Sequence, residues 1–96
     1  MLKHVVMFKL HTRSDVQRAS LVAAIESLRE GIDVVRSLEV GVDCLSTALS
    51  YDVIATVTVD DRAALETYSK HPKHRAALAV VRELSQAVAV VDYETP

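Results

Sequence analysis

Apolar and polar residues alternate along four segments of the chain, which is the period of a β-strand. The four segments are residues 2–10, 36–44, 51–59 and 87–93. Residues 51–59 are rich in β-branched side chains, which supports a strand there. Residues 36–44 have one apolar and one polar face, whereas the other three segments carry apolar residues on both faces. We therefore expect both faces of those three strands to be covered.

Two regions between the strands carry apolar residues at helical spacing. The first follows a capping box that opens at Ser14, and Gly31 suits the end of this helix because glycine tolerates a left-handed conformation. The second begins at Asp60 or Asp61 and breaks before Pro72, since proline disfavours helix in the residue before it and favours the first turn of a new helix. This region is therefore predicted to be two helices that meet at a corner.

The predicted order is strand, helix, strand, strand, helix pair, strand, which is that of the ferredoxin-like βαββαβ fold. We place the chain in the α+β class, as a single domain over residues 1–96 with a four-stranded antiparallel sheet. Helices would cover one face of this sheet and leave the other face open. The apolar residues that need cover there are Val5, Met7, Ile54 and, in the last strand, either Ala89 with Val91 or Val88 with Val90. The sheet of a second chain is the simplest cover, so we predict a homodimer whose two sheets close into a barrel.

Composition and charge narrow the class of protein. Half of the residues are hydrophobic, the net charge is -2, and no Lys/Arg cluster of the kind that binds nucleic acid is present. The one cysteine, Cys44, excludes an internal disulfide and is expected to pack on the apolar face of its strand. The apolar first ten residues are too short and too charged for a signal peptide or a membrane span. We expect a cytoplasmic protein that binds neither nucleic acid nor membranes.

The predicted corner, residues 68–75, holds two of the four histidines and one of the three tyrosines. A histidine such as His74 can act as a general base near neutral pH, and a carboxylate such as Asp92 can orient its ring. The same pair can equally be a structural hydrogen bond that pins a helix to the last strand. Tyr68 can donate a hydrogen bond to a developing enolate oxygen, or it can be a core residue whose hydroxyl reaches the surface.

The remaining polar candidates have simpler interpretations. His71 directly precedes Pro72, a place that suits a helix cap. His4 shares a strand face with Phe8 and is either a satisfied core histidine or part of a pocket wall. His71 and His74 are three residues apart, but the intervening proline spreads them and no further residue has the spacing of a metal ligand. We therefore expect no metal and no other cofactor.

Four blocks of the sequence resemble the stress-responsive dimeric α/β-barrel family, often called Dabb. The blocks are LKHVVMFKL at 2–10, SLEVG at 37–41, YSKHPKH at 68–74 and VVDYE at 90–94. They follow the order of the family from one end of the chain to the other, and the tyrosine with His-Pro-x-His is the most specific of them. The resemblance implies a ferredoxin-like dimer with a barrel between the subunits.

The family includes plant proteins similar to olivetolic acid cyclase, which closes a ring by aldol condensation without metal or cofactor. By resemblance to that pattern, His74 is the general base, Tyr68 assists it, and Asp92 is the partner of His74. The same pattern places His4 in the pocket wall. Where the cyclase has a further pocket histidine on its third strand, this chain has Val53, which weakens the likeness to the cyclase chemistry.

Three hypotheses about function follow. In the first, the chain binds a small, mostly apolar molecule and is a cofactor-free cyclase or isomerase with a histidine base. Its catalytic residues are then His74, Tyr68 and Asp92, and its substrate-binding residues are His4, His71, Val53 and Phe8. In the second, the chain is a non-catalytic structural or stress-related dimer. The third, a cofactor-free monooxygenase-like enzyme, rests on analogy of fold alone.

Overall fold

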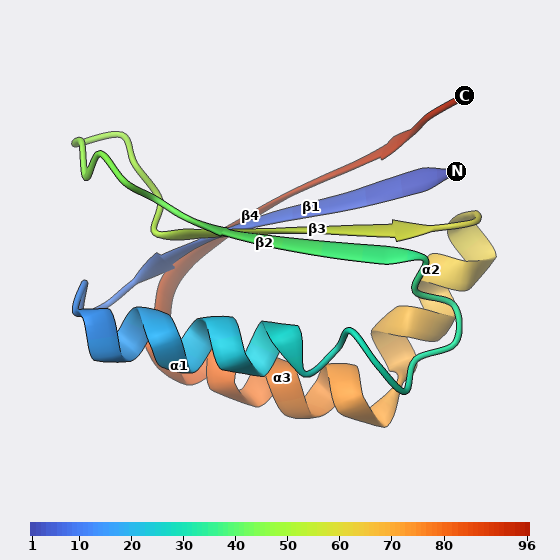
Figure 1. Cartoon of the computed structure of the whole chain (residues 1–96), viewed down its shortest axis with the longest axis horizontal. Helices are drawn as coiled ribbons and strands as arrows, with labels where there is room; N and C mark the ends of the chain where they lie inside the picture. The colour runs from blue at the N-terminus through green and yellow to red at the C-terminus, as the bar shows by residue number, and fades with distance from the viewer.

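The chain folds in the order that its apolar pattern predicts. A computed structural model describes all residues, 1–96. The elements are β1 (Leu2–Leu10), α1 (Asp15–Glu26), β2 (Ser37–Val42), β3 (Val53–Val59), α2 (Arg62–Lys70), α3 (Pro72–Leu84) and β4 (Ser85–Glu94). Helices α1 and α3 lie side by side under the sheet, and α2 closes one end of the space between the two layers (Figure 1).

The four strands form one antiparallel sheet in the order β2-β3-β1-β4, which confirms the predicted ferredoxin-like arrangement. Strand β1 lies inside the sheet, and its register places His4 between Val57 of β3 and Asp92 of β4. Residues that pair directly across strands point to the same face. The register alone therefore brings His4 and Asp92 together, although 88 positions separate them in the chain.

The core lies between the sheet and the helices. Alternate residues of β3 face the helices, and all of these are buried, as the period of two predicts. The buried cluster consists of Leu2, Phe8, Leu10, Leu21, Ile25, Leu28, Ile32, Leu38, Val53, Ala55, Val57, Val59, Tyr68, Ala77 and Val81. This layer of side chains fixes the distance between the sheet and α3, where the candidate site lies.

Helix α1 begins as predicted but ends earlier. The Ser14 side chain accepts a hydrogen bond from the Gln17 backbone at 3.1 Å, which is the expected cap. The prediction that the helix runs to Gly31 was wrong, because the chain tightens after Glu26 into turns that bury Leu28. Gly31 belongs to the connection that follows and has a φ of +85°, which favours glycine.

Strands β2 and β3 are shorter than predicted, and residues 43–52 between them form a projecting segment that we call the arm. The Asp43 carboxylate accepts a hydrogen bond from Ser46, which turns the chain away from the sheet after Val42. Cys44 is therefore exposed, and the prediction that it packs on an apolar strand face was wrong. Asp52, at the other end of the arm, directly precedes β3 and is buried.

The face of the sheet that the helices leave uncovered carries the predicted apolar residues, together with polar ones such as Lys3, Glu39 and Thr56. The register of β4 places Ala89, Val91 and Tyr93 on this face, whereas Val88 and Val90 point toward the helices. Its large exposed side chains are Met7, Ile54, Val91 and Tyr93. None of the helices is long and apolar enough to cross a membrane.

Candidate functional site

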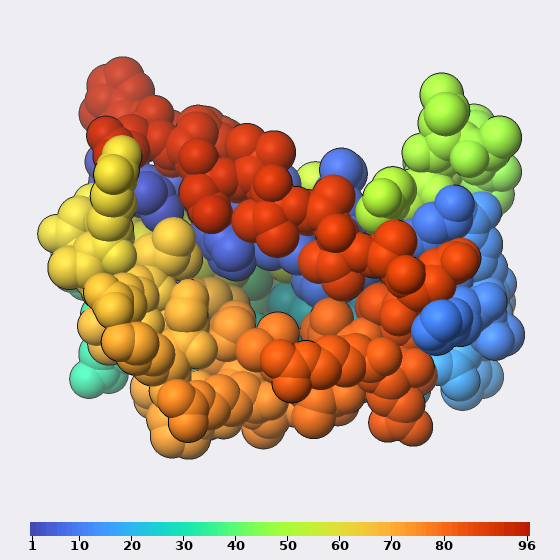
Figure 2. All heavy atoms as spheres, turned by 180° about the vertical axis from the view of Figure 1, so that it is seen from behind, coloured from blue at the N-terminus to red at the C-terminus, as the bar shows by residue number.

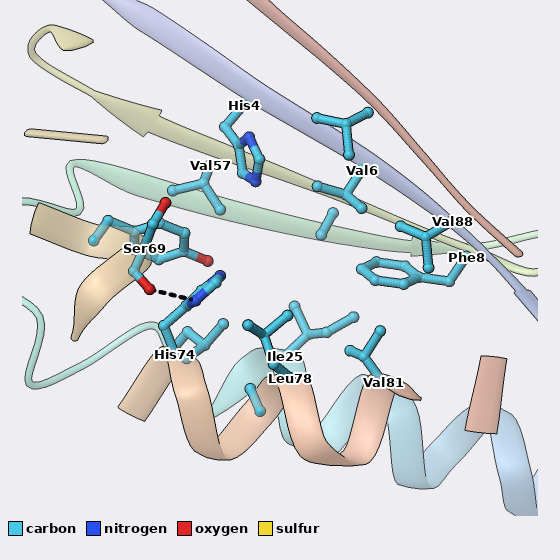
Figure 3. A pocket seen from close by; sticks show the side chains of 15 residues that line it. His4, Val6, Phe8, Ile25, Val57, Ser69, His74, Leu78, Val81 and Val88 are labelled. Carbon is cyan, nitrogen blue, oxygen red and sulfur yellow. Dashed lines mark hydrogen bonds between the residues drawn. The ribbon is translucent and has the colours of Figure 1, made fainter. Parts of the chain in front are cut away.

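A cavity of about 220 Å³ lies between the sheet and the helices α1, α2 and α3. Twelve of its fifteen lining residues are hydrophobic, and none is Lys, Arg, Asp or Glu. The other three, His4, Ser69 and His74, gather at the end near the corner between α2 and α3 (Figure 3), where Tyr68 also contacts both histidine rings. The cavity therefore has one end that can form hydrogen bonds and one end that is only apolar.

The space-filling view is hollowed between β4 and α3, where β4 is the free edge of the sheet (Figure 2). Val88 and Val90 line the cavity and are nevertheless 47% and 51% exposed. Both residues point toward the helices, so their exposure means that no helix or strand covers the cavity at the β4 edge. A ligand can therefore enter along the edge of the sheet.

The corner exists because His71 and Pro72 end one helix and start the next. His71 adopts an extended conformation with a ψ of 139°, and its Nδ1 accepts a hydrogen bond from the Lys73 backbone at 3.1 Å. This confirms the cap that its place before Pro72 predicts. The break brings Tyr68 at the end of α2 against His74 in the first turn of α3, with their ring centroids 4.6 Å apart.

His74 presents an unprotonated nitrogen to the cavity. Its Nδ1 lies 3.0 Å from the Ser69 carbonyl oxygen, which can only accept, so Nδ1 carries the hydrogen. The neutral ring then has its lone pair on Nε2, and this second nitrogen points into the cavity (Figure 3). Burial lowers the pKa of His74 below its ordinary 6.5; the Ser69 bond opposes this and the nearby His4 adds to it. The ring is thus neutral at neutral pH and can accept a proton.

Tyr68 remains a donor under the same conditions. The residue is 3% exposed, and burial raises the pKa of its hydroxyl to about 12. Its ring also packs edge to face against His4 at a centroid distance of 6.1 Å. Tyr68 therefore lies between the two cavity histidines with a hydroxyl that keeps its proton.

Asp92 hydrogen bonds with His4, not with His74. The predicted pairing of Asp92 with His74 is wrong in this structure, because the strand register sets Asp92 beside His4 and Ser69 already occupies Nδ1 of His74. The carboxylate accepts from Nδ1 of His4, which leaves the other ring nitrogen pointing into the cavity (Figure 3). The chain thus holds two fixed imidazoles: the ring of His74 bonds to a backbone carbonyl, and the ring of His4 bonds to a carboxylate.

Four of the predicted site residues line the cavity, namely His4, Phe8, Tyr68 and His74. The other three do not: Asp92 stands behind His4, His71 caps α3, and Val53 is buried in the core at 2% exposure. Sequence reasoning missed Ser69, whose backbone carbonyl sets the tautomer of His74. No residue type signals a carbonyl partner, so only the geometry of the corner could reveal it.

Comparison with known proteins extends these observations. An uncharacterized protein of Streptomyces coelicolor is 32% identical, and the match covers 98% of this chain and 99% of that protein. A dimeric ferredoxin-like protein of unknown function from Bacteroides fragilis is 31% identical, covers 98% of this chain and 95% of its own, and has a TM-score of 0.85. A hydroxynitrile lyase from Passiflora edulis shares the fold at 14% identity, with coverage of 96% and 90% and a TM-score of 0.82.

A comparison with protein families agrees with this fold and with the order of the sequence blocks. The sequence model of the family described as Stress responsive A/B Barrel Domain matches residues 2–95. The match includes all four strands, both walls of the cavity and the His-Pro-x-His corner. The chain therefore belongs to the stress responsive A/B barrel (Dabb) family.

Proposed function

We propose that this protein binds a small, neutral, mostly apolar carbonyl compound and acts on it by acid–base chemistry with His74 as the base. The observation that carries the proposal is the fixed, unprotonated nitrogen of His74 in the cavity, with the ring of Tyr68, whose hydroxyl keeps its proton, 4.6 Å away between centroids. The cavity is smaller than the roughly 300–1,000 Å³ of typical ligand pockets, which favours a small ligand. No charged side chain lines it, so an anionic ligand would lack a counterion there.

The proposed step is removal of a proton from the carbon next to the carbonyl group. The proton moves to Nε2 of His74, the electron pair of the C–H bond moves into the carbonyl group, and the resulting enolate oxygen accepts a hydrogen bond from Tyr68. Return of the proton to another carbon gives an isomerase. Attack of the enolate on a second carbonyl group of the same molecule forms a C–C bond, the alkoxide so formed takes the proton from Nε2 of His74, and the result is a cyclase. Neither outcome requires an oxidant or a reductant.

His4 has a supporting place in this proposal. The Asp92 carboxylate fixes its ring and provides a counter-charge if the ring takes up a proton. His4 is thus suited to bind the polar end of the ligand opposite His74 and to receive or return a proton. The hydroxynitrile lyase with the same fold is an enzyme, which is compatible with catalysis on this scaffold but assigns no residue role here.

We also propose that two copies form a homodimer through the open face of the sheet. Met7, Ile54, Val91 and Tyr93 leave a contiguous apolar surface there, and the Bacteroides fragilis protein with 31% identity is dimeric. Size-exclusion chromatography with light scattering tests this arrangement. We expect twice the monomer mass at micromolar concentration, and a stable monomer would contradict the proposal.

A non-catalytic role is the second candidate, and one observation favours it. Both histidine hydrogen bonds also tie elements together, since His4–Asp92 joins β1 to β4 and His74–Ser69 closes the α2–α3 corner. In that case the His74→Ala variant would lose stability and no ligand would bind to the protein.

One experiment separates these two functions without knowledge of the natural substrate. A methyl ketone with a heptyl tail is dissolved in D₂O with the protein, and NMR follows the exchange of the protons next to the carbonyl group. The wild-type protein should accelerate this exchange, and His74→Ala should not. Equal exchange with wild type and with no protein would contradict the acid–base proposal. Native mass spectrometry of protein taken directly from cells would then identify any co-purifying ligand.

A further inference from the structure

The arm, residues 43–52, keeps a defined shape although it projects from the sheet. Within it, the Ser46 backbone donates to the Asp43 carboxylate at 2.7 Å, and the Thr47 backbone donates to the Ser50 hydroxyl at 3.0 Å. Ser46 has a φ of 50°, a conformation that is uncommon for residues other than glycine. These local bonds hold the arm in one conformation without support from a hydrophobic core of its own.

The base of the arm is fixed to the body of the protein by Asp52. The Asp52 carboxylate accepts a hydrogen bond from the Leu10 backbone at 2.8 Å and pairs with Arg13 and Arg18 at 3.3 and 3.6 Å. Arg13 also donates to the Ser50 carbonyl oxygen at 2.7 Å. The direction in which the arm projects is therefore set by buried and charge-assisted bonds.

The arm carries two of the most exposed apolar side chains of the protein. Leu45 is 76% exposed and Leu49 is 92% exposed. Single exposed leucines are ordinary on protein surfaces, but these two project from an ordered segment beside an apolar groove. The groove lies at the base of the arm and includes Met7, Val42, Leu49, Tyr51 and Ile54.

The arm and the open face of the sheet form one continuous surface. Met7 and Ile54 belong to both the groove and the open face, and the arm curls away from the helices toward that face in both views (Figures 1 and 2). A body that covers the open face therefore also meets the arm. The Bacteroides fragilis relative is dimeric. We therefore take a second copy of the chain as the partner that covers this surface.

We propose that the arm is a clasp that packs Leu45 and Leu49 of each copy onto the partner subunit in a face-to-face dimer. The inference rests on the proposed homodimer and adds the segment that fastens it. In a dimer with two-fold symmetry both arms make the same contact, so Leu45 and Leu49 are buried in both copies. Removal of the two leucines should therefore weaken the dimer more than removal of one ordinary surface contact.

The Leu45→Ser, Leu49→Ser double variant tests the clasp by sedimentation velocity over a dilution series. From the apolar burial of two leucines, we expect the dissociation constant of the dimer to rise by at least about a hundredfold. The matched control is Val16→Ser, since Val16 is also exposed, at 73%, but lies on α1 in the helix layer. The control should dimerise as the wild type does. An unchanged dissociation constant in the double variant would overturn the clasp.

Two further variants keep this test decisive. Ile54→Asp places a charge in the open face and should abolish the dimer. If it does so while the double variant dimerises normally, the face-to-face dimer is supported and the clasp is contradicted. A monomeric wild type would overturn both. The chain has no tryptophan, so Leu49→Trp gives a single reporter whose emission should move to shorter wavelength as the dimer forms. Emission that stays unchanged through dimer formation would also contradict the clasp.

Discussion

The two cavity histidines face the same space but differ in the group that accepts the hydrogen bond from Nδ1. His74 donates through Nδ1 to a backbone carbonyl at the corner between α2 and α3, whereas His4 donates through Nδ1 to the Asp92 carboxylate near the edge of the sheet. A carbonyl dipole fixes a ring without a full negative charge, and a carboxylate fixes it with one. In the proposed reaction, His74 is the proton acceptor, whereas His4 is the ring whose orientation a carboxylate fixes.

This contrast shows that a residue type does not define a role by itself. Burial lowers the pKa of His74, and Tyr68 beside it has its pKa raised to about 12, so burial favours the neutral form of both groups. A neutral imidazole accepts a proton and a neutral phenol donates a hydrogen bond. Burial alone therefore makes an acceptor and a donor of two neighbouring side chains in one cavity.

Loss of His74 should have the largest effect on chemistry. We expect His74→Ala to slow ketone proton exchange by about 10²–10⁴-fold, the usual contribution of a positioned general base. NMR in D₂O measures the exchange, and His11→Ala is the control, because His11 is exposed and does not line the cavity. Exchange by His74→Ala at close to the wild-type rate would remove the distinction between the two histidines.

Loss of the Tyr68 hydroxyl should have the next largest effect. We expect Tyr68→Phe to slow the same exchange by about 10²–10³-fold, as the loss of one oxyanion donor does. The ring keeps its packing in this variant, so the free energy of unfolding in urea should stay close to that of the wild type. A large loss of stability with unchanged exchange would instead assign Tyr68 to the core alone.

Removal of the charge behind His4 should have a modest effect on stability. We expect Asp92→Asn to lower the free energy of unfolding by about 1 kcal/mol, because the hydrogen bond to a charged group weakens and Asp92 is partly exposed. Urea unfolding measures this change, and Asp33→Asn, at an exposed position outside the site, is the matched control. If the two variants were equally stable, the carboxylate would have no part in fixing His4.

The smallest effect concerns pH. Because the pKa of folded His74 is lowered, the unfolded chain binds the proton more readily, and protonation favours unfolding. The contribution of neutral His74 is therefore fully present above pH 6.5 and is lost as the pH falls through the folded pKa. Urea midpoints of wild type and His74→Gln above and below pH 6.5 should differ by more at the higher pH. A midpoint difference that is independent of pH would contradict the lowered pKa.

Local signals in the sequence were sufficient to predict much of this fold. The period of two predicted β1 and β3, the His71–Pro72 pair predicted the corner, and Ser14 predicted the start of α1. Each of these depends on neighbours in the chain, which a sequence displays directly. The end of α1 was misplaced because the backbone of Leu28 and Arg29 already bonds three residues back, so the regular helix ends before Gly31.

The errors in the site concern contacts between distant segments. Asp92 was assigned to His74 because the register of β4 against β1 was not known, and a shift of one residue moves a side chain to the other face. Asp52 fell within the predicted strand 51–59, whereas it precedes β3 and is buried by Arg13, Arg18 and the end of β1. Such pairings depend on how strands and loops meet, so a single sequence cannot determine them.

The most direct test of the account is the tautomer and titration of His74 by NMR of ¹⁵N-labelled protein. Long-range couplings distinguish a protonated Nδ1 from a protonated Nε2, and comparison with His74→Gln assigns the signals. The account predicts a neutral ring at pH 7 with the hydrogen on Nδ1 and a titration midpoint below 6.5. A ring that is charged at that pH, or that carries its hydrogen on Nε2, would contradict the proposal that His74 is the base.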